Sequence, residues 1–311
     1  MKFSIAIPSY KSYYLDEAIK SVVSQTYSNW ELIIVDDHSP EDIPSIVKPY
    51  LKDSRVKFYR NDINCGAEKV VDNWNICLSY CTGEYVICMG DDDRLMPCCL
   101  DEFRKLIKKY PEVNVYHART EIIDENGKVT EILNTRPERE DVLSMMKHKW
   151  EWQKQFIGDF CYQRNHLVSQ GGYYILPFAW GSDDITAFRA AFSYGIANFN
   201  KIGFQYRENN KSLSLSFHEI EKVEAVRLQK QWYTTILDNL RIQNKYSKEE
   251  LDAATDSMNR FVNELTCYHI YRDLKHGNAC RYLNWLRIIS KYNISIFTLT
   301  KLYLKSFIYN V

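Results

Sequence analysis

The chain has 311 residues, of which 45% are hydrophobic, and this is enough to bury a sizeable core in one large domain or two small ones. Lys and Arg total 40 and Asp and Glu total 40, so the net charge is zero and gives no reason to expect nucleic acid as a partner. The apolar start is too short for a signal peptide, and no stretch of about 18 uncharged apolar residues predicts a membrane-spanning helix.

The nine cysteines indicate neither a zinc site nor a disulfide framework. No Cys-x-x-Cys pair occurs, and no Cys/His spacing suits zinc. An odd number of cysteines without a secretion signal is typical of reduced thiols, so we expect a cytoplasmic protein.

The first 120 residues alternate between short apolar runs, which predict buried strands, and segments with apolar residues at helical spacing. The order predicts a mostly parallel sheet with helices on both faces, a Rossmann-like α/β fold. The expected strands are 3–7, 31–35, 55–59, 85–89 and 113–116, and the expected helices are 15–23, 43–51, 70–78 and 97–109.

The pattern changes after residue 120. Asn126-Gly127 lies between two strand-like segments and predicts a hairpin. The stretch 134–155 is polar, with a helix expected in its second half, and residues 185–194 predict another helix.

From about residue 219 the sequence is helical to its end. Ser247 and Glu250 form a capping-box pattern, and Gly277 suits a helix C-cap. We therefore expect an α/β domain over residues 1–218 and a helical C-terminal extension over 219–311.

Polar residues follow three of the expected strands. Pro8-Ser9-Tyr10 follows the first, Asp36-Asp37 the second, and Asp91-Asp92-Asp93 the fourth. In an open parallel sheet the carboxyl ends of the strands form the ligand-binding edge, so these residues should converge. Adjacent carboxylates repel each other unless a cation compensates, which points to a hard divalent metal that bridges to phosphates.

Each acidic cluster also has a purely structural interpretation. Asp36-Asp37 is what a helix N-cap and turn would show, and Asp91–Asp93 is compatible with a solvated turn before the helix at Pro97. Placing three consecutive carboxylates next to a buried strand costs free energy unless a partner compensates their charge, which favours a ligand site.

Two common nucleotide-binding motifs are absent. No G-x-G-x-x-G follows the first strand, and no G-x-x-x-x-G-K-[ST] occurs, so neither a dinucleotide fold nor a P-loop is expected. The segment after the first strand also lacks the Gly-rich basic loop of a sugar nucleotidyltransferase. A diphosphate would therefore be neutralised by metal rather than by a glycine-rich loop.

Several short motifs occur in one characteristic order. They are Ser4–Tyr10, Ser24–Tyr27, Glu31–Ser39, Asn64-Cys65-Gly66, Asn73-Trp74-Asn75, Gly83-Glu84-Tyr85, and Asp92-Asp93 with Pro97. This set, within residues 2–215, resembles the family 2 glycosyltransferases of bacterial surface-polysaccharide synthesis. The resemblance implies a GT-A fold, sugar transfer with inversion, Mn²⁺ or Mg²⁺ as cofactor and a nucleoside-diphosphate sugar, expected to be a UDP-sugar, as donor.

The same resemblance implies roles for the residues at the strand ends. Asp37 matches the carboxylate that holds the nucleobase, and Pro8, Ser9 and Tyr10 would line the same pocket. The Asp91–Asp93 cluster matches the metal- and donor-binding D-x-D motif. The usual family pattern is Asp-x-Asp-Asp, and here Gly90 holds its first position. Either Asp91 and Asp93 form a shifted motif, or Asp92 and Asp93 act without the first carboxylate.

A second acidic pair, Asp183-Asp184, matches the motif that supplies the catalytic base of the family. Inverting transfer needs a group that takes the proton from the acceptor hydroxyl as it attacks the anomeric carbon. We expect Asp184 to be this base and Asp183 to orient the acceptor. Trp180 would stack on an acceptor sugar, although a core position is equally compatible. The pair also suits a helix N-cap, and the two roles are compatible.

The pair Tyr206-Arg207, with Ser212 and Ser214, resembles the late loop of the family near the diphosphate. This resemblance makes Arg207 a candidate contact to the donor, with Ser212 and Ser214 nearby in the chain. Asn209 replaces the His often found in this loop. His218 is a fallback contact to metal or phosphate, and an ordinary surface role is the alternative.

The end of the chain is basic and aromatic. Residues 268–311 contain one acid, Asp273, and seven Lys or Arg: Arg272, Lys275, Arg281, Arg287, Lys291, Lys301 and Lys305. Such a segment suits an anionic membrane surface, and this would fit a glycan or lipid-linked acceptor. Packing against the rest of the chain and homodimer formation are the alternatives.

The sequence thus predicts a metal-dependent hexosyltransferase. A catalytically idle nucleotide-sugar-binding module at the membrane is the alternative from another class, and Gly90 is the feature that favours it. A sugar nucleotidyltransferase is disfavoured by the absent Gly-rich loop.

Overall fold

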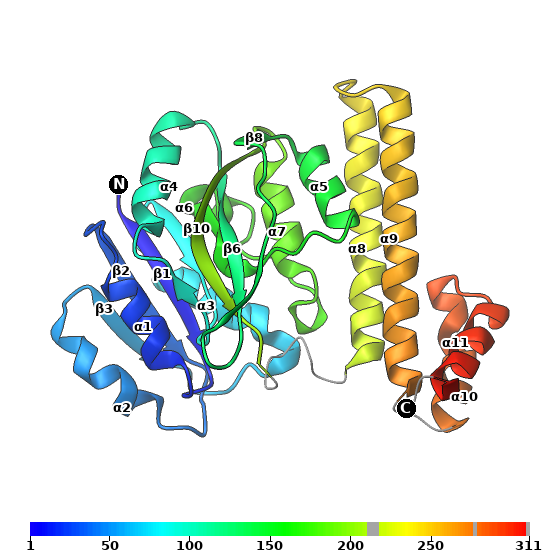
Figure 1. Ribbon diagram of the computed structural model, residues 1–311, viewed down its shortest axis with the longest axis horizontal. Helices are drawn as coiled ribbons and strands as arrows, with labels where there is room; N and C mark the ends of the chain where they lie inside the picture. Colours follow the sequence, from blue (N-terminus) through cyan, green and yellow to red (C-terminus); the bar gives the residue numbers. More distant parts are fainter. Residues whose placement is uncertain (210–217, 276–278, 309–311) are drawn as a thin grey trace. The chain divides into compact units, whose positions relative to one another are not determined.

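The computed structural model describes residues 1–209, 218–275 and 279–308. It divides into two compact units (Figure 1). The first comprises residues 1–149, 153–175 and 182–212, and the second comprises 150–152, 176–181 and 213–311. Two short segments, 150–152 and 176–181, are thus grouped with the helical region although no change of composition along the sequence marks them.

The first unit is built on one mixed sheet. Its strands are β1 (Phe3–Ser9), β2 (Trp30–Asp36), β3 (Val56–Arg60), β4 (Tyr85–Cys88), β5 (Arg94–Leu95), β6 (Val115–Ile123), β7 (Val129–Ile132), β8 (Arg139–Glu140), β9 (Phe160–Gln163) and β10 (Ile196–Arg207). The order is β3-β2-β1-β4-β9-β6-β10-β5, with β7 on β6 and β8 on β10. β1 pairs in parallel with β2 and β4, and β2 pairs in parallel with β3, which confirms the expected parallel sheet for this half.

The parallel order ends at β4. The expected fifth strand is the start of β6, and β9 lies between β4 and β6, antiparallel to both. β10 then pairs in parallel with β6. The expected hairpin around Asn126-Gly127 is present as the antiparallel pair β6–β7.

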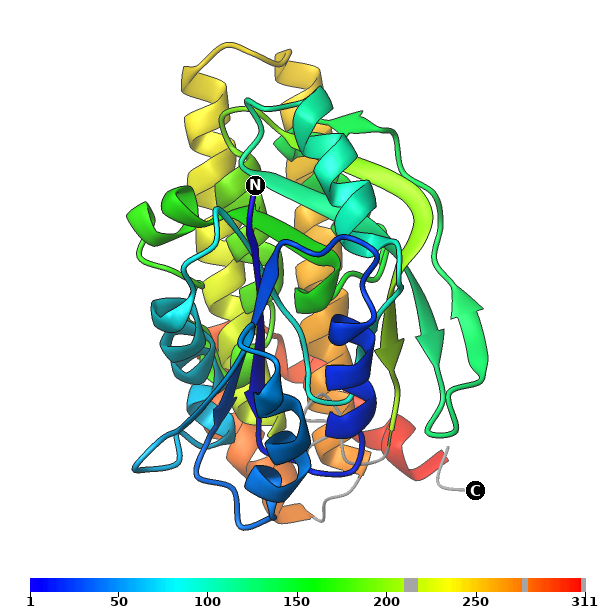
Figure 2. The same ribbon diagram turned by 90° about the vertical axis from the view of Figure 1, so that its left-hand side faces the viewer.

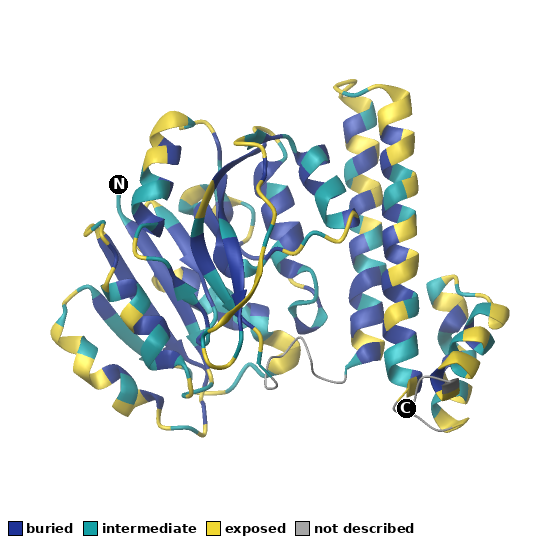
Figure 3. Ribbon diagram, viewed as in Figure 1, coloured by how far each residue is buried: buried dark blue, intermediate teal, exposed yellow. Residues whose placement is uncertain are grey.

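Helices cover both faces of this sheet, as the sequence predicts (Figure 2). The helices of this part of the chain are α1 (Leu15–Val23), α2 (Ile43–Val47), α3 (Val70–Tyr80), α4 (Cys99–Lys109), α5 (Val142–Trp150), α6 (Arg164–Ser169) and α7 (Ser182–Ala191). Side chains at alternate positions of β1 and β2 join α1, α2 and α4 in one buried cluster, and α3 contacts the same two strands. Because both faces are covered, these strands are buried along almost their whole length (Figure 3).

The second unit is helical, as expected. It contains α8 (Glu219–Ile242), α9 (Lys248–Lys275), α10 (Ala279–Ile288) and α11 (Ile296–Ile308). The amide of Ser247 donates to Glu250 Oε2 at 2.8 Å and the amide of Glu250 donates to Ser247 Oγ at 3.1 Å, which confirms the capping box. Gly277, Ser212 and Ser214 lie outside the described residues. Among the residues that are described, no helix has the length and apolarity needed to cross a membrane.

Candidate active site

The polar residues that follow β1, β2 and β4 converge at one edge of the sheet. Ser9 pairs with Asp36 in the β1–β2 register, and the amide of Asp37 donates to the carbonyl of Ser9 at 2.8 Å. Asp91 Oδ2 accepts from the amides of Tyr10 and Lys11 at 2.7 and 2.8 Å. The end of β4 is therefore tied directly to the segment that leaves β1, as expected for strand ends in a parallel sheet.

The two adjacent aspartates after β2 have different surroundings. Asp36 is fully buried, its Oδ1 accepts from the amide of Ser39 and its Oδ2 forms an ion pair with Arg60 at 2.7 Å. These contacts hold the turn that follows β2. Asp37 instead lies at the carboxyl edge of the sheet beside Ser9, whose buried hydroxyl has no hydrogen-bond partner within the described part of the chain. Such an unsatisfied hydroxyl needs an explanation, and a ligand at this edge would provide one.

A short loop after β3 holds Asp37 in place. Asn61 Nδ2 donates to Asp37 Oδ1 at 2.8 Å, and the amide of Cys65 donates to the same oxygen at 2.9 Å. Asn64 Nδ2 donates to the carbonyl of Asp37 at 2.6 Å, and Asn61 also bonds to buried Asn73. The asparagines of two sequence motifs therefore act as supports for Asp37, a role that their positions along the chain do not reveal.

Gly90 leaves room for the acidic cluster. A Cβ at this position would lie 2.8 Å from Asp92 Oδ1 and 2.8 Å from Asp93 Oδ2, so both oxygens approach the same point. Asp92 is only partly buried, and its Oδ2 accepts from Asn209 Nδ2 at 2.8 Å. Asp91 is oriented toward the β1 segment by its two backbone contacts.

Asp93 is held by the end of β10. Its Oδ1 accepts from the amide of Arg207 at 2.9 Å, and the Arg207 side chain is fully buried. The guanidinium donates to the carbonyls of Asp92, Asp124 and Glu125 and forms an ion pair with Glu17 at 2.7 Å. Arg207 therefore joins the acidic cluster to neighbouring loops and is arranged to position Asp93.

Burial and mutual repulsion make the charged forms of this cluster costly. Burial raises the pKa of Asp91, and the charge of Asp92 adds to the effect. Burial and the Asp92 charge likewise raise the pKa of Asp93 well above its ordinary value. A bound cation would relieve this repulsion, and carboxylate oxygens are suitable ligands for Mg²⁺ and Mn²⁺. Within the described ranges, no group of three His, Cys, Asp or Glu side chains forms a metal site by itself.

The second acidic pair lies in the first turn of α7, where carboxylates interact favourably with the helix dipole. The helix begins at Ser182, earlier than the sequence predicts, so both aspartates belong to it. Asp184 is buried, its Oδ2 lies 2.8 Å from Lys149 Nζ, and its Oδ1 accepts from Gln155 Nε2 at 2.6 Å. Asp183 is more exposed, and its Oδ1 accepts from the amide of Asp184.

Lys149 and Gln155 contact Asp184 and are not among the candidate residues predicted from the sequence. Lys149 is on α5 and Gln155 is in the following loop, about 30 residues before the pair along the chain. Neither belongs to a recognisable motif, and only the fold brings them to the carboxylates. Their one sequence signal is the polar character of the stretch 134–155.

Trp180 and His218 belong to the second compact unit. Trp180 is partly buried, its ring meets His269 edge to face at 4.9 Å, and Lys222 Nζ lies 4.8 Å from the ring centre. His218 stacks on Phe178 with ring centres 4.1 Å apart. Both aromatic side chains thus have packing roles within this unit.

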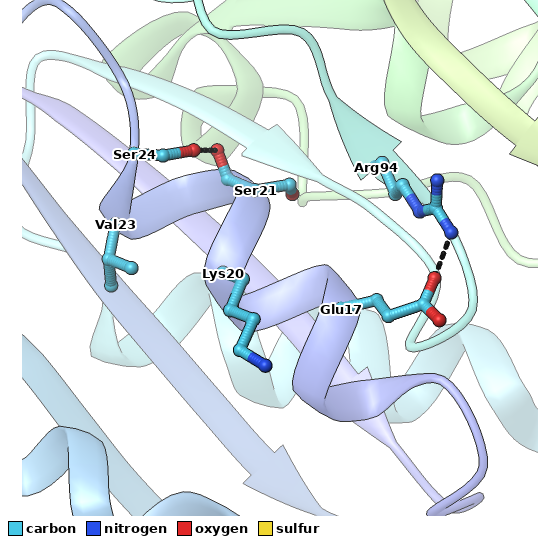
Figure 4. A pocket seen from close by; sticks show the side chains of 6 residues that line it. All are labelled: Glu17, Lys20, Ser21, Val23, Ser24 and Arg94. Atoms are coloured by element: carbon cyan, nitrogen blue, oxygen red, sulfur yellow. Dashed lines mark hydrogen bonds and ion pairs between the residues drawn. The ribbon is translucent and has the colours of Figure 1, made fainter.

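A shallow hollow of about 510 Å³ lies on α1 and β5 (Figure 4). Glu17 and Arg94 form an ion pair at its rim, and Lys20, Ser21, Val23 and Ser24 complete the lining. None of the expected donor or acceptor residues lines this hollow. Its relation to the site is indirect, through Glu17, which also binds Arg207.

The family model described as "Glycosyl transferase family 2" matches residues 4–177, more than half of the chain. The chain belongs to glycosyl transferase family 2. The match includes the strand ends that carry Asp37 and Asp91–Asp93.

Curated relatives match about a third of this family member. It is 44% identical over 103 residues to the putative colanic acid biosynthesis glycosyl transferase WcaA of Escherichia coli K12, covering 32% of this chain and 36% of that protein. It is 33% identical over 115 residues to the putative glycosyltransferase EpsE of Bacillus subtilis 168, covering 36% and 40%. The chain therefore matches between about a third and two-fifths of the length of these relatives.

Solved structures agree on the fold. TarS residues 1–349 of S. aureus superpose with a TM-score of 0.64 at 18% identity, covering 88% of this chain and 79% of that one. A mannosyltransferase of Pyrobaculum calidifontis, solved with GDP-Man and Mn²⁺, gives a TM-score of 0.53 at 14% identity, covering 99% and 86%. These similarities establish the GT-A fold of this family 2 member, as the sequence predicts.

Proposed function

We propose that this chain is a cytoplasmic inverting glycosyltransferase that moves a hexose from a nucleoside-diphosphate sugar to a glycan or lipid-linked acceptor in polysaccharide synthesis. The observation that carries the proposal is the convergence of Asp37 and Asp91–Asp93 at the carboxyl edge of a GT-A sheet. Family membership supports the same reaction.

The donor nucleotide would bind over the ends of β1 and β2. Asp37, fixed by Asn61 and Cys65, is suited to accept a hydrogen bond from an imide N–H of the base. Pro8, Ser9 and exposed Tyr10 would line the same pocket. A uracil base has such an imide, so a UDP-sugar is the expected donor. One structural neighbour was solved with UDP-GlcNAc.

Asp92 and Asp93 would hold Mn²⁺ or Mg²⁺, with the donor diphosphate completing the coordination. When bound, the metal would stabilise the negative charge that develops on the leaving nucleoside diphosphate. Asp91 supports this arrangement through the amides of Tyr10 and Lys11, which connects the metal residues to the nucleotide pocket. We assign Arg207 to the positioning of Asp93 instead of a direct phosphate contact, since its guanidinium is buried among protein partners.

Asp184 would be the general base. The acceptor oxygen forms a bond to the anomeric carbon while the bond from that carbon to the diphosphate oxygen breaks, and the hydroxyl proton passes to Asp184. Asp183 would orient the acceptor hydroxyl. Curated relative WfgD of Escherichia coli, 35% identical over 91 residues, is named as a glucosyltransferase acting on a diphosphoundecaprenol-linked sugar. A lipid-linked acceptor is therefore a reasonable substrate class for this chain.

We also propose that α10 and α11 contact an anionic membrane. Trp285 of α10, Leu299 of α11 and Ile289 from the short turn between the two helices pack with the α9 residues Ile270 and Leu274. The opposite side exposes apolar and basic side chains: Leu283, Arg287, Ile296, Phe297, Lys301, Leu304 and Phe307. Residues 279–308 contain no acid, so nothing in this segment opposes attraction to anionic lipid.

Ion pairs within the helical unit involve some of the basic residues near the end of the chain. Arg272, Arg281 and Lys291 form ion pairs with Glu219, Asp273 and Glu224, respectively. These three cations therefore make contacts within the helical unit. A homodimer through the exposed side of α11 is the alternative to membrane contact.

A panel of UDP- and GDP-sugars with and without Mn²⁺, measured by thermal shift and nucleotide release, tests the function. A true donor at about 100 times its Kd should stabilise the fold by about 2.7 kcal/mol, and the shift should vanish in chelator. Binding without any release of nucleotide would favour the catalytically idle module. Gly90, which stands where the family pattern has a carboxylate, is the feature that favours this alternative. Pyrophosphate release from a sugar phosphate and a nucleoside triphosphate would instead indicate a nucleotidyltransferase.

A further inference from the structure

We propose that Lys149, together with Gln155, is a positioning residue that selects Asp184 as the ionised, oriented member of the acidic pair. This inference rests on the proposed function, in which the pair accepts the acceptor's proton. It adds to that function the reason why Asp184, and not its neighbour Asp183, is the base.

The geometry around Asp184 is asymmetric. Lys149 Nζ lies 2.8 Å from Oδ2 and Gln155 Nε2 lies 2.6 Å from Oδ1, so each oxygen has one fixed donor. Two donors on separate elements restrict rotation of the carboxylate about its χ2 bond. Each oxygen retains lone-pair capacity for a further hydrogen bond, which an acceptor hydroxyl requires.

Among the residues that the structure describes, Asp183 forms no ion pair like that of Asp184 with Lys149. Its Oδ1 accepts a hydrogen bond from the amide of Asp184 at 2.9 Å, and it lies beside the charge of that residue. Burial raises the pKa of Asp183, and the Asp184 charge raises it further, while Lys149 opposes both effects. Two adjacent carboxylates with one nearby cation favour a state in which one ionises and the other keeps a proton.

Lys149 is suited to remain charged in this setting. Burial alone would lower its pKa, but the carboxylates of Asp184 and Asp183 more than offset this effect and the pKa of Lys149 is raised. The ion pair therefore persists at neutral pH. An oriented, ionised Asp184 is the state that a general base needs before the acceptor binds.

Other charged groups around the pair belong to neighbouring ion pairs and hydrogen bonds. Arg136 lies 3.0 Å from Glu140 Oε1, and Glu140 also faces His148 at 2.9 Å. Asp159 accepts hydrogen bonds from Thr120 Oγ1 and the amide of Phe156, and it lies 3.7 Å from His117 Nε2. The phenol of Tyr162, whose pKa burial raises well above its ordinary value, remains neutral. Among these groups, Lys149 is the cation that forms an ion pair with Asp184.

The test compares Lys149→Met, Lys149→Arg and Lys147→Met. Lys147 is on the same helix, so its substitution removes one positive charge without removing the Asp184 ion pair. The readout is the pH dependence of kcat/KM for nucleotide release in Mn²⁺, with the UDP- or GDP-sugar of the panel that the wild type turns over fastest. We expect Lys149→Met to lower kcat/KM roughly 10–100-fold at pH 7. It should also move the acidic limb of the kcat/KM–pH profile to higher pH by about one unit or more. Lys149→Arg should restore most of the activity, and Lys147→Met should leave the limb in place.

A second measurement separates this inference from the proposed function. Urea unfolding of Lys149→Met, Asp184→Asn and the double variant gives their coupling energy at pH 7 and at pH 4. A coupling energy at pH 7 that decreases at pH 4 supports the ion pair, whether or not the protein turns over the donor. No coupling at pH 7, or a loss of activity in Lys149→Met without a shift of the limb, overturns the selection of Asp184. Full activity of Asp184→Asn with coupling intact overturns the base assignment, and thus the proposed mechanism, while the ion pair stands.

Discussion

Asp93 Oδ1 accepts a hydrogen bond from the amide of Arg207 at 2.9 Å, which joins the loop after β4 to the last residue of β10. This contact fixes one carboxylate of the proposed metal site, and the buried Arg207 side chain fixes the surrounding loops. The residue proposed for metal is thus held by the mixed half of the sheet, and the residues proposed for the nucleotide lie in its parallel half.

This arrangement makes Asp93 the residue to substitute in a test of the proposed metal site. Asp93→Ala should weaken Mn²⁺-dependent binding of the donor by at least roughly 10–100-fold, because a carboxylate ligand is lost. Isothermal titration of the nucleotide sugar in Mn²⁺, and again in chelator, measures the effect. Asp36→Asn is the control, because Asp36 supports the β2 turn and should alter stability more than metal dependence. Equal donor affinity with and without metal in the wild type would exclude the proposed role.

Asp184→Asn keeps the side-chain shape and removes the proton acceptor. Transfer should fall by roughly 10²–10⁴-fold, the usual range for a general base, while donor affinity stays close to the wild-type value. The measurement is kcat for nucleotide release together with donor Kd. If Asp183→Asn is inactive and Asp184→Asn is not, the roles within the pair are reversed.

Much of the fold could be predicted because its strands and helices follow patterns within short segments of the sequence. The strands and helices up to residue 110 follow apolar periodicity, and Asp37 and Asp91–Asp93 converge because parallel strands end at the same edge. The short strand β9 was not predicted. It has four residues and enters the sheet next to β4, far earlier in the chain, so its partners and not its own pattern determine its place.

The residues that contact Asp37 and Asp184 could not be predicted either, because their partners are distant in the sequence. Lys149, Gln155 and Asn61 are ordinary polar residues in the sequence, and their roles come from contacts with residues 24 to 35 positions away. The roles of Asp37, Asp93 and Asp184 came from the resemblance to a family, and they stay predictions until the variants are measured.

Glu31 should make the stability of the first unit dependent on acid pH. It is buried and accepts hydrogen bonds from Lys2, Ser4 and Thr82. Burial alone would raise its pKa, but these bonds prevail and lower it from 4.5 to about 2. Because the folded pKa lies below the unfolded one, the stabilisation is complete above about pH 4.5 and is lost as the pH falls toward 2.

The variant Glu31→Gln tests this linkage. At pH 7 it should lower the free energy of unfolding by roughly 1–3 kcal/mol, and the difference from wild type should shrink between pH 5 and pH 2. Urea unfolding across this range provides the values. Glu84→Gln is the matched control, because Glu84 is largely exposed and should show little effect. A difference that stays constant down to pH 2 would contradict the assigned pKa.

The exposed side of α11 provides the last prediction. Deletion of residues 281–311 would remove Trp285 and Ile289 from the cluster that covers Ile270 and Leu274, so a loss of stability would obscure any loss of binding. Point variants avoid this problem. Phe297 is 80% exposed and Leu304 is 59% exposed, so the double variant Phe297→Ser/Leu304→Ser should leave the melting temperature nearly unchanged.

Co-sedimentation with vesicles of phosphatidylcholine containing 30% phosphatidylglycerol then measures membrane contact, with pure phosphatidylcholine as the uncharged comparison. The wild type should pellet at low salt and be released by salt, because each Lys or Arg near the surface contributes about 1 kcal/mol and is screened by ions. The Phe297/Leu304 variant should lose the apolar part of binding, and Lys301→Gln should lose part of the salt-sensitive fraction. Leu299→Ala is the matched control on the buried side, where a lower melting temperature without a change in vesicle binding is expected. A wild type that stays in the supernatant at low salt, and that forms a dimer disrupted by the Phe297/Leu304 variant, would assign the exposed side of α11 to self-association.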